Sequence, residues 1–229
     1  MALRQWFSFC VLTPLVALLA CHRHHAVFQT DNSVLTRCLQ PVAYFPAFKT
    51  GAIGLVWGQD QVDWETHTLQ RMGEPSLYSC TEHLKEPMLR FLWDRSLSAP
   101  ISARLIVHAN GTGTLIIRML ANGTLMPPPL PNEKQPTEAD FYRRTLDREI
   151  TLTTDHVNHI LALLMKIRFV TDRNVPNTTD GSDWIFETEE AGRYRLVDFR
   201  NEPSSSAKEL GLYLVRDMGH ISLPESAIY

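Results

Sequence analysis

Hydrophobic and polar residues alternate in two neighbouring stretches of the chain, residues 101–108 and 114–120. The apolar positions are Ile101, Ala103, Leu105 and Val107 in the first stretch and Leu115, Ile117 and Met119 in the second. A period of two places alternate side chains on one face of a β-strand. Residues 110–113, with the letters N-G-T-G, supply turn residues between the stretches. The pattern therefore predicts a β-hairpin with one apolar face.

Further strands are predicted on either side of this hairpin. Residues 88–93 form an apolar run with one charge, which suits a buried strand or a helix turn; the strand is favoured because a sheet is predicted to follow. Residues 184–189 and 194–199 are β-rich runs around the turn letters E-A-G-R. Residues 42–69 combine aromatic residues with three glycines, which favours short strands and tight turns. Because the strands come in hairpins and do not alternate singly with helices, the expected fold is α+β with a mostly antiparallel sheet.

Two helices are predicted to cover one face of this sheet. Residues 154–168 carry apolar positions at helical spacing after a cap at Thr153 or Thr154. Those apolar positions are Val157, Ile160, Leu161, Leu164 and Ile167. Residues 206–218 begin with Ser206 and Glu209 in capping-box spacing and end before Gly219.

Five prolines between residues 126 and 136 predict an extended segment, either a surface loop or an interdomain linker. The loop is favoured because the preceding hairpin needs the following helix to cover its apolar face. Residues 40–229 are thus expected to form a single α+β domain, whose length is ample for one core.

The N-terminus has the anatomy of a secretory signal. Residues 1–20 contain one positive charge, Arg4, followed by a mostly apolar run that ends at His22. A membrane-spanning helix is the alternative, but it needs about 20 apolar residues, and Pro14 interrupts this run. Residues 1–20 are therefore predicted to be a signal peptide.

The letters L-L-A-C at residues 18–21 resemble the lipobox of bacterial lipoproteins. The resemblance implies cleavage before Cys21 and a lipid on that cysteine, with residues 21–39 as the tether. The next residue is His22, not the aspartate that retains such proteins in the inner membrane, which implies an outer-membrane anchor facing the periplasm. An ordinary cleaved signal with a chance cysteine is the alternative.

The remaining cysteines, Cys38 and Cys80, form an even pair in an oxidising compartment. A disulfide between them would close a loop of 43 residues and contribute up to about 4 kcal/mol. Two buried thiols are the alternative. Removal of residues 1–20 changes the net charge from −3 to −4, and a mildly acidic domain gives no support to a nucleic-acid partner.

A turn rich in Asp and Gly at residues 180–183 is followed by further carboxylates and aromatic residues. A ligand site is predicted there, with Asp180, Asp183, Trp184, Glu187 and Tyr194 as its residues. Calcium would suit the carboxylates, although the spacing of an EF-hand loop is absent. A solvated turn leading into a strand, with Trp184 in the core, is the alternative interpretation.

The candidate residues for catalysis and metal binding do not have the sequence spacing that the known motifs require. His156 and His159 lie three apart, but zinc needs a third ligand, and the H-E-x-x-H pattern is missing. Ser205 and Lys208 match S-x-x-K without the later elements of penicillin-recognising enzymes. We therefore expect no cofactor and name no catalytic or metal-binding residue.

The chain from about Met88 onward resembles a group of uncharacterised bacterial lipoproteins. The shared pattern is D-G-x-x-W-x-x-E at residues 180–187, G-x-Y at residues 192–194 and a terminal helix. The resemblance implies the domain but supplies no activity. The leading hypothesis is a non-enzymatic binding or accessory module, held on the membrane by its lipid, for an unknown envelope protein or ligand. A periplasmic hydrolase with a site assembled from distant residues is the alternative.

Overall fold

The structure of the protein is a computed structural model that describes residues 43–46, 59–95, 98–121, 143–169, 181–200 and 202–223. The chain divides into two compact units, Met1–Thr30 and Asp31–Tyr229, and all described residues belong to the second. The predicted signal peptide, Cys21, Cys38, Asp180 and the Pro-rich segment lie outside the described residues.

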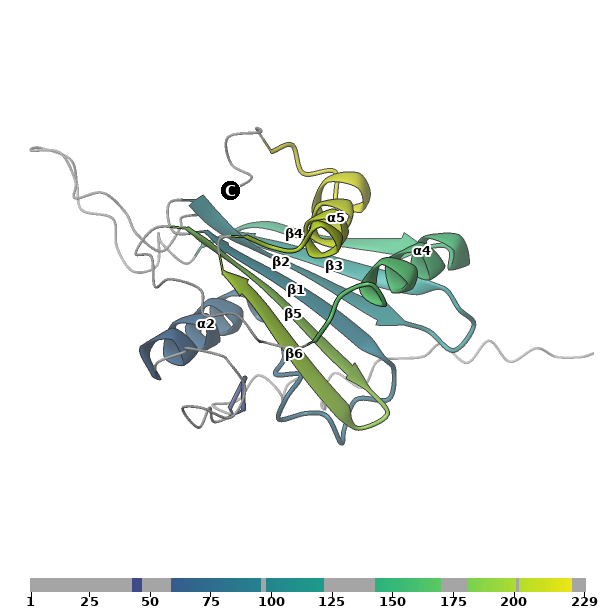
Figure 1. Ribbon diagram of the computed structural model, residues 1–229, viewed down its shortest axis with the longest axis horizontal. Helices are drawn as coiled ribbons and strands as arrows, with labels where there is room; N and C mark the ends of the chain where they lie inside the picture. Colours follow the sequence, from purple (N-terminus) through teal and green to yellow (C-terminus); the bar gives the residue numbers. More distant parts are fainter. Residues whose placement is uncertain are drawn as a thin grey trace, which may run out of the picture. The chain divides into compact units, whose positions relative to one another are not determined.

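A six-stranded antiparallel sheet forms the centre of the described part and confirms the predicted α+β class. Its strands are β1 (Met88–Arg95), β2 (Ser98–Val107), β3 (Gly113–Leu120), β4 (Arg144–Leu152), β5 (Ser182–Glu190) and β6 (Arg193–Arg200). They lie in the order β4-β3-β2-β1-β5-β6. The first four strands make a meander, and the β5–β6 hairpin joins its free side, so that β1 and β5 are neighbours at the centre (Figure 1).

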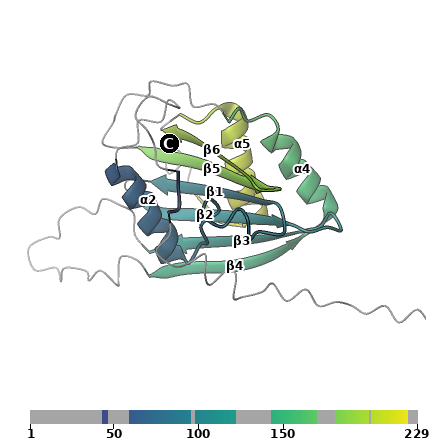
Figure 2. The same ribbon diagram turned by 90° about the horizontal axis from the view of Figure 1, so that it is seen from below.

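Helices α4 (Thr154–Leu164) and α5 (Ser205–Leu212) cover one face of the sheet (Figure 2). The predicted alternation is confirmed there, because Ile101, Ala103, Leu105, Leu115 and Ile117 all point into this layer. Their side chains are fully buried. The hairpin thus turns one apolar face to the helices, as the alternation predicts.

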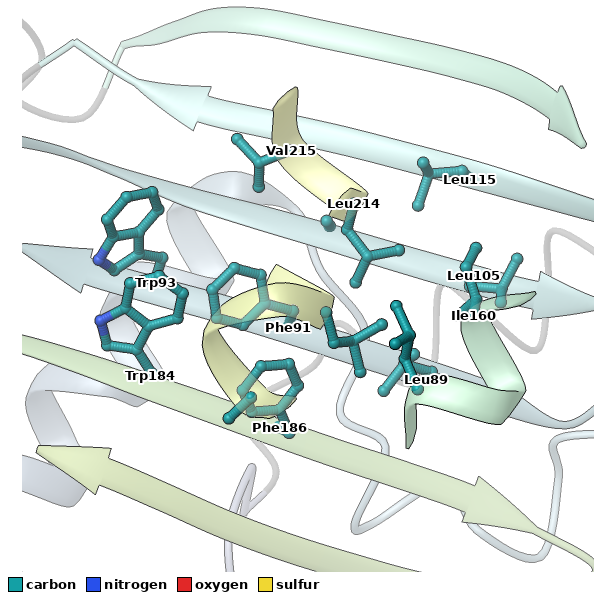
Figure 3. Packing of buried hydrophobic residues seen from close by; sticks show 14 of the residues in the cluster. Leu89, Phe91, Trp93, Leu105, Leu115, Ile160, Trp184, Phe186, Leu214 and Val215 are labelled. Atoms are coloured by element: carbon teal, nitrogen blue, oxygen red, sulfur yellow. The ribbon is translucent and has the colours of Figure 1, made fainter. Parts of the chain in front are cut away.

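Four aromatic rings from the central strands fill the middle of this layer (Figure 3). The rings of Phe91 and Phe186 stack with centroids 4.6 Å apart, and those of Trp93 and Trp184 lie 4.5 Å apart. Gly211 of α5 packs directly above them, where a β-carbon added to the glycine would come within 2.7 Å of Trp184. A glycine at this position lets the helix approach the rings closely.

The helix boundaries differ in detail from the sequence predictions. Thr153 caps α4 as predicted, and its side chain accepts a hydrogen bond from the backbone of His156. The cap of α5 is Ser204, which accepts from Ala207, so the predicted capping role of Ser206 is wrong. Helix α5 continues into a π-helical segment, η1 (Tyr213–Met218).

Helix α2 (Gln59–Met72) occupies a region for which the sequence pattern predicts short strands, and this prediction is wrong for the part described. The helix packs on the opposite face of the sheet from α4 and α5 (Figure 2). Its buried stripe includes Leu69 and Met72 but also the polar residues Glu65 and Thr68. Polar residues inside the stripe hide the helical period from a hydrophobicity pattern.

Strand β4 is not predicted by the sequence pattern. Among the described strands it pairs only with β3 and lies at one end of the strand order. Most of its residues are exposed or half-buried, so its hydrophobic alternation is weak. In the described part of the chain, no helix is both long enough and apolar enough to cross a membrane.

Candidate functional site

The face of the sheet under α2 carries buried charged residues beside an apolar cluster. Because Leu89, Phe91 and Trp93 point towards α4 and α5, the alternate residues of β1 point towards α2. These are Arg90, Leu92 and Asp94. The charged side chains of Arg90 and Asp94 are both buried. Buried charges are rare in proteins unless they are paired, so the partners of these groups define the candidate site.

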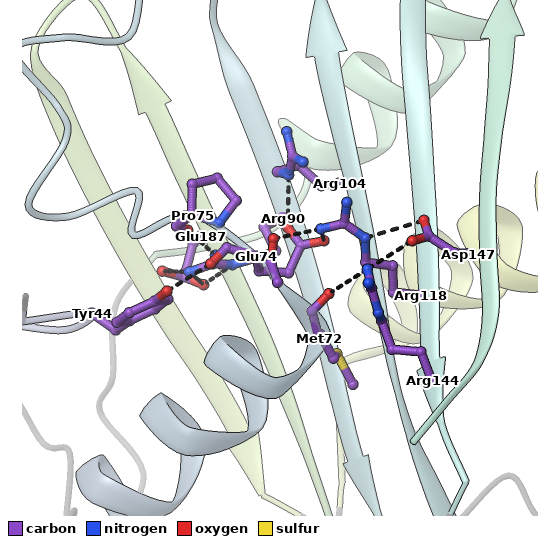
Figure 4. Close-up of polar contacts among 11 residues, drawn as sticks. Tyr44, Met72, Glu74, Pro75, Arg90, Arg104, Arg118, Arg144, Asp147 and Glu187 are labelled. Atoms are coloured by element: carbon purple, nitrogen blue, oxygen red, sulfur yellow. Dashed lines mark hydrogen bonds and ion pairs between the residues drawn. The ribbon is translucent and has the colours of Figure 1, made fainter. Parts of the chain in front are cut away.

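Arg90 forms a closed ion pair with Glu187 on the adjacent strand (Figure 4). Arg90 Nε donates to Glu187 Oε2 at 2.6 Å and Nη2 donates to Oε1 at 2.8 Å, while both side chains are 0% exposed. Arg90 Nη1 donates to the carbonyl oxygen of Pro75 at 2.5 Å, and the hydroxyl of Tyr194 donates to Glu187 Oε1 at 2.8 Å. The group therefore ties β1, β5, β6 and the loop after α2 together.

The electrostatics of this pair keep Arg90 charged. Burial by itself lowers the pKa of Arg90, but the charge and hydrogen bonds of Glu187 outweigh it, and the pKa of Arg90 is raised. Burial, followed by the charge of Glu187, raises the pKa of Tyr194 well above its ordinary value. Tyr194 is thus held as a neutral donor, which suits a positioning contact rather than an acid or base.

Glu74 is the centre of a second buried group in Figure 4. Its carboxylate accepts from Arg104 Nε at 2.7 Å and from Arg118 Nη1 at 3.1 Å, and its side chain is 0% exposed. Burial raises the pKa of Glu74, but the positive charges of Arg104, Arg118 and Arg90 outweigh that effect and lower the pKa. The hydroxyl of Tyr44 donates to the backbone oxygen of Glu74 at 2.7 Å.

Arginines also cap the C-terminal end of α2. Arg118 Nη1 donates to the Gly73 carbonyl at 2.7 Å, and Arg144 Nη1 lies 3.4 Å from the Met72 carbonyl. Asp147 bridges the two arginines at 3.2 and 2.7 Å. The last carbonyls of a helix lack internal partners and carry partial negative charge. These arginines therefore hold the end of α2 against β3 and β4.

The backbone at the same end forms a Schellman motif. Gly73 has a φ of +73°, and its amide donates to the Gln70 carbonyl at 2.9 Å. The amide of Glu74 donates to the Leu69 carbonyl at 2.9 Å. A glycine in the left-handed region is the usual residue at this position of the motif. Helix α2 thus ends at a defined point, with Glu74 directed at the sheet.

Four carboxyl groups gather near the other half of α2: Glu65 of the helix, Asp94 of β1, Asp183 of β5 and Asp198 of β6. Glu65 is 0% exposed. Gln61 Nε2 donates to Glu65 Oε1 at 2.8 Å and to Asp183 Oδ2 at 3.0 Å. The Oε2 atom of Glu65 is buried without a hydrogen-bond partner among the described residues. We call these four groups the carboxyl cluster.

Several described side chains contact the carboxyl cluster. Trp64 Nε1 donates to Asp94 Oδ2 at 2.8 Å. Arg200 Nε lies 3.4 Å from Asp183 Oδ1, and Arg200 Nη2 donates to Gln61 Oε1 at 3.2 Å. Within the described ranges, no cation is among the groups that act on the Glu65 carboxyl. The cluster is therefore unlike the Glu74 group, whose carboxylate faces arginines.

The pKa values reflect this difference. Burial, followed by the charges of Asp94, Asp183 and Asp198, raises the pKa of Glu65 well above 4.5. Burial is also the main reason why the pKa of Asp183 rises from 3.8 to about 6, against the opposing effect of Arg200. Burial and neighbouring carboxylates both favour the protonated form of a carboxyl group. Across the described ranges, no three His, Cys, Asp or Glu residues are arranged to hold a metal ion.

The structure brings only some of the predicted ligand-site residues together. Glu187 and Tyr194 share a hydrogen bond, whereas Asp183 belongs to the carboxyl cluster. Trp184 points to the opposite face, is 0% exposed and donates to Ser182 Oγ at 3.0 Å. Adjacent residues of a strand face opposite sides, so Asp183 and Trp184 cannot line one pocket on the same face of the sheet.

The other sequence candidates have ordinary surroundings in the described residues. His159 is exposed and its ring meets the ring of Tyr213, with centroids 4.7 Å apart. Cys80 is 4% exposed and is not a free thiol. Because Cys38 lies outside the described residues, its bridge to Cys80 stays a prediction.

A hydroxyl–imidazole–carboxylate arrangement that sequence reasoning missed lies beside the first hairpin. His108 Nε2 is 2.8 Å from Thr114 Oγ1, and His108 Nδ1 is 2.8 Å from Glu86 Oε1. The side chains of His108 and Glu86 are each 32% exposed. The predicted hairpin placed His108 and Thr114 near each other across its turn, but nothing in the linear sequence indicated Glu86 as the third group.

A scan against models of protein families, a search of curated proteins and a search of solved structures each found no match to this chain.

Proposed function

We propose that this protein is an exported lipoprotein, anchored through Cys21 to the outer membrane, whose domain is a non-enzymatic binding or accessory module in the periplasm. The lipobox-like letters at residues 18–21 carry the proposal. They follow a charged start and an apolar run, which is the order that an export signal requires.

The arrangement of the buried charges supports a structural rather than a catalytic task for the polar face. The guanidinium of Arg90 is bound by the Glu187 carboxylate and the Pro75 carbonyl. The carboxylate of Glu74 is bound by Arg104 and Arg118. Such closed groups hold α2 and its following loop on the sheet. A rigid, helix-covered platform of this kind suits a module that presents its outer surface to a partner.

The anchor is tested by replacing the lipid-bearing cysteine. A Cys21→Ala variant is expected to leave the membrane fraction, and mass spectrometry should show the loss of the lipid mass. Cys10→Ala is the matched control, because Cys10 lies inside the predicted signal and should leave lipidation unchanged. A Cys21→Ala protein that stays in the membrane with an unchanged mass would overturn the anchor.

The binding role is tested by cross-linking in intact cells, followed by purification from solubilised envelope. A defined envelope component that is recovered with the wild-type protein, and lost when the Cys21→Ala variant is used, supports an accessory module. Recovery of the protein alone under conditions that capture a known envelope complex would contradict the role.

A hydrolase is the second candidate, and the Thr114–His108–Glu86 arrangement is the observation that favours it. In the tautomer with the proton on Nδ1, His108 donates to Glu86, and its Nε2 accepts from the hydroxyl of Thr114. This is the order of groups in which an imidazole acts as general base for a nucleophilic hydroxyl. The half-exposed position leaves the histidine open to solvent.

An assay with p-nitrophenyl esters of different chain lengths tests this candidate. The hydrolase requires activity that falls at least about a hundredfold in His108→Ala and survives in Thr114→Ser, which keeps the hydroxyl. The control is His83→Ala, because His83 is exposed outside the group. Equal rates for wild type, His108→Ala and His83→Ala would exclude the hydrolase and leave a surface hydrogen-bond network.

A further inference from the structure

The carboxyl cluster lies between α2 and three strands that are far apart in the sequence. Glu65 comes from the helix, and Asp94, Asp183 and Asp198 come from β1, β5 and β6. Glu65 is fully buried, and one of its oxygens has no hydrogen-bond partner among the described residues. An ionised carboxylate in this position would face other carboxylates across the interface, which costs free energy in a buried environment.

We propose that the carboxyl cluster is a proton-binding site that holds α2 on the sheet, so that the helix docks firmly when the cluster is protonated and loosens when it loses its proton. A proton on Glu65 removes the repulsion and supplies a donor where the structure shows an unpartnered oxygen. Because the described carboxyls are not arranged to hold a metal ion, the cation that fits this site is a proton.

The groups that face Glu65 come from every element packed against it: Gln61 and Trp64 of α2, Asp94 of β1, Asp183 of β5, and Asp198 and Arg200 of β6. Arg200 forms an ion pair with Asp183 at 3.4 Å and a hydrogen bond with Gln61. It is not among the groups that shift the pKa of Glu65. Among these described groups Arg200 is the one cation, and its ion pair is with Asp183 and not with Glu65.

The direction of the response follows from proton linkage. The pKa of Glu65 is raised in the folded protein, so the docked state binds more protons than the undocked state above the ordinary pKa of a glutamate. Docking therefore weakens as the pH rises towards the folded-state value. The same sign holds for Asp183, whose pKa is about 6.

The helix should loosen from its N-terminal half. Its C-terminal end is held by Arg118 on the Gly73 carbonyl and on Glu74, where opposite charges compensate each other. These contacts lack the carboxyl repulsion that surrounds Glu65. Gly73, with its φ of +73°, is the first residue after the helix, and the contacts of Arg118 to Gly73 and Glu74 should hold this end in place.

Hydrogen–deuterium exchange of the full chain in detergent micelles tests the proposal, after correction for the intrinsic pH dependence of exchange. Between about pH 5 and about pH 8, the protection of the α2 amides of residues 61–70 should fall by at least about tenfold in the wild type. The α4 amides should keep constant protection, which separates local loosening from global unfolding.

Substitutions distinguish the cluster from a general pH effect. Glu65→Gln imitates the protonated carboxyl and should keep α2 protected at about pH 8, and Asp183→Asn should reduce the response partly. Glu149→Gln is the matched control, because Glu149 is an exposed carboxylate on β4, and it should respond like the wild type.

Three results would overturn the proposal. The first is equal α2 protection at both pH values in the wild type, and the second is an unchanged pH response in Glu65→Gln. The third is recovery of protection on addition of calcium at about pH 8 and its loss with a chelator, which would make a metal ion the ligand. If the protein senses the pH of the surrounding medium through this response, that role rests on the proposed export. The exchange measurement does not depend on Cys21, so either proposal can fail alone.

Discussion

Arg90 and Glu187 stand directly opposite each other in the register of the two central strands, and their side chains form a two-point ion pair that is completely buried. The pair is the point at which the β1–β4 meander is joined to the β5–β6 hairpin on the α2 side. On the other side of the same strands, Phe91 and Phe186 are also opposite each other and stack. The same strand register thus pairs the charges on one face of the sheet and stacks the rings on the other.

Removal of one partner of this pair is expected to be costly. Glu187→Gln leaves the Arg90 charge buried without its counter-charge, which should lower the free energy of unfolding by about 3–5 kcal/mol. Urea denaturation measures the loss. Glu190→Gln is the control, because Glu190 is exposed at the end of the same strand, and it should change stability by less than about 0.5 kcal/mol. An equal loss of unfolding free energy in both variants would contradict a stabilising role of the buried ion pair.

A methyl group at Gly211 should disturb the aromatic layer. Its β-carbon would lie 2.7 Å from Trp184 Cζ3 and 2.8 Å from Phe91 Cζ, which is too close for packed atoms. We expect Gly211→Ala to lower the free energy of unfolding by about 1–3 kcal/mol through overpacking. Lys208→Ala, an exposed position on the same helix, is the control. An equally stable Gly211→Ala protein would contradict the close approach of α5 to the rings.

Stability should have an optimum on the acidic side of neutral pH. The pKa of Glu74 is lowered below 4.5, so its contribution is present above the unfolded value and is lost as the pH falls. The pKa values of Glu65 and Asp183 are raised, so their contribution to stability is present at low pH and is lost as the pH rises. Stability should fall as the pH rises from the unfolded value of Asp183, 3.8, through about 6.

Urea denaturation at a series of pH values measures this profile. Glu65→Gln should be more stable than the wild type on the alkaline side and should flatten the fall there. Glu149→Gln serves again as the exposed control. A stability that rises steadily from mildly acidic to alkaline pH would contradict the assigned directions.

The predicted bridge between Cys38 and Cys80 is tested by peptide mapping without reduction. We expect one cross-linked peptide pair that contains both cysteines, and a loss of up to about 4 kcal/mol of stability on reduction. Cys80 is buried and is not a free thiol, so mild alkylation should leave it unmodified. Labelling of both cysteines in the unreduced protein would contradict the bridge.

The strands of the first hairpin could be predicted because their signal is local. The alternation of Ile101, Ala103 and Leu105 is set by the geometry of a strand with one buried face, and the turn letters lie beside it. The cap at Thr153 is local in the same way. These features need no knowledge of what lies far away in the chain.

Helix α2 could not be predicted because its buried positions include Glu65 and Thr68. Glu65 is an unlikely core residue until Gln61, Asp94 and Asp183 are placed around it, and the last of these is more than a hundred residues away in the sequence. Strand β4 could not be predicted for a related reason: among the described strands it pairs with β3 alone, and its sequence pattern stays polar.

The predicted ligand site shows the same limit. The sequence indicated the carboxylates and aromatics of residues 183–194, and the structure places Glu187 against Tyr194. The alternation of strand β5 already implied that Asp183 and Trp184 face opposite sides. What it did not indicate was Arg90, because nothing local in the sequence around residue 187 specifies which strand will lie beside it.

The sequence by itself determined the features that a short segment carries alone: the strand alternation, the turns and the helix cap. The proposed anchor at Cys21 also rests on a short segment, the lipobox-like letters at residues 18–21. The tertiary structure alone decided which charges meet. Arg90 pairs with Glu187 while Glu65 is left among carboxyls, because strand order and register set the neighbours of a buried charge. Burial then makes each such neighbour decisive, since a charge removed from water has no other source of stabilisation.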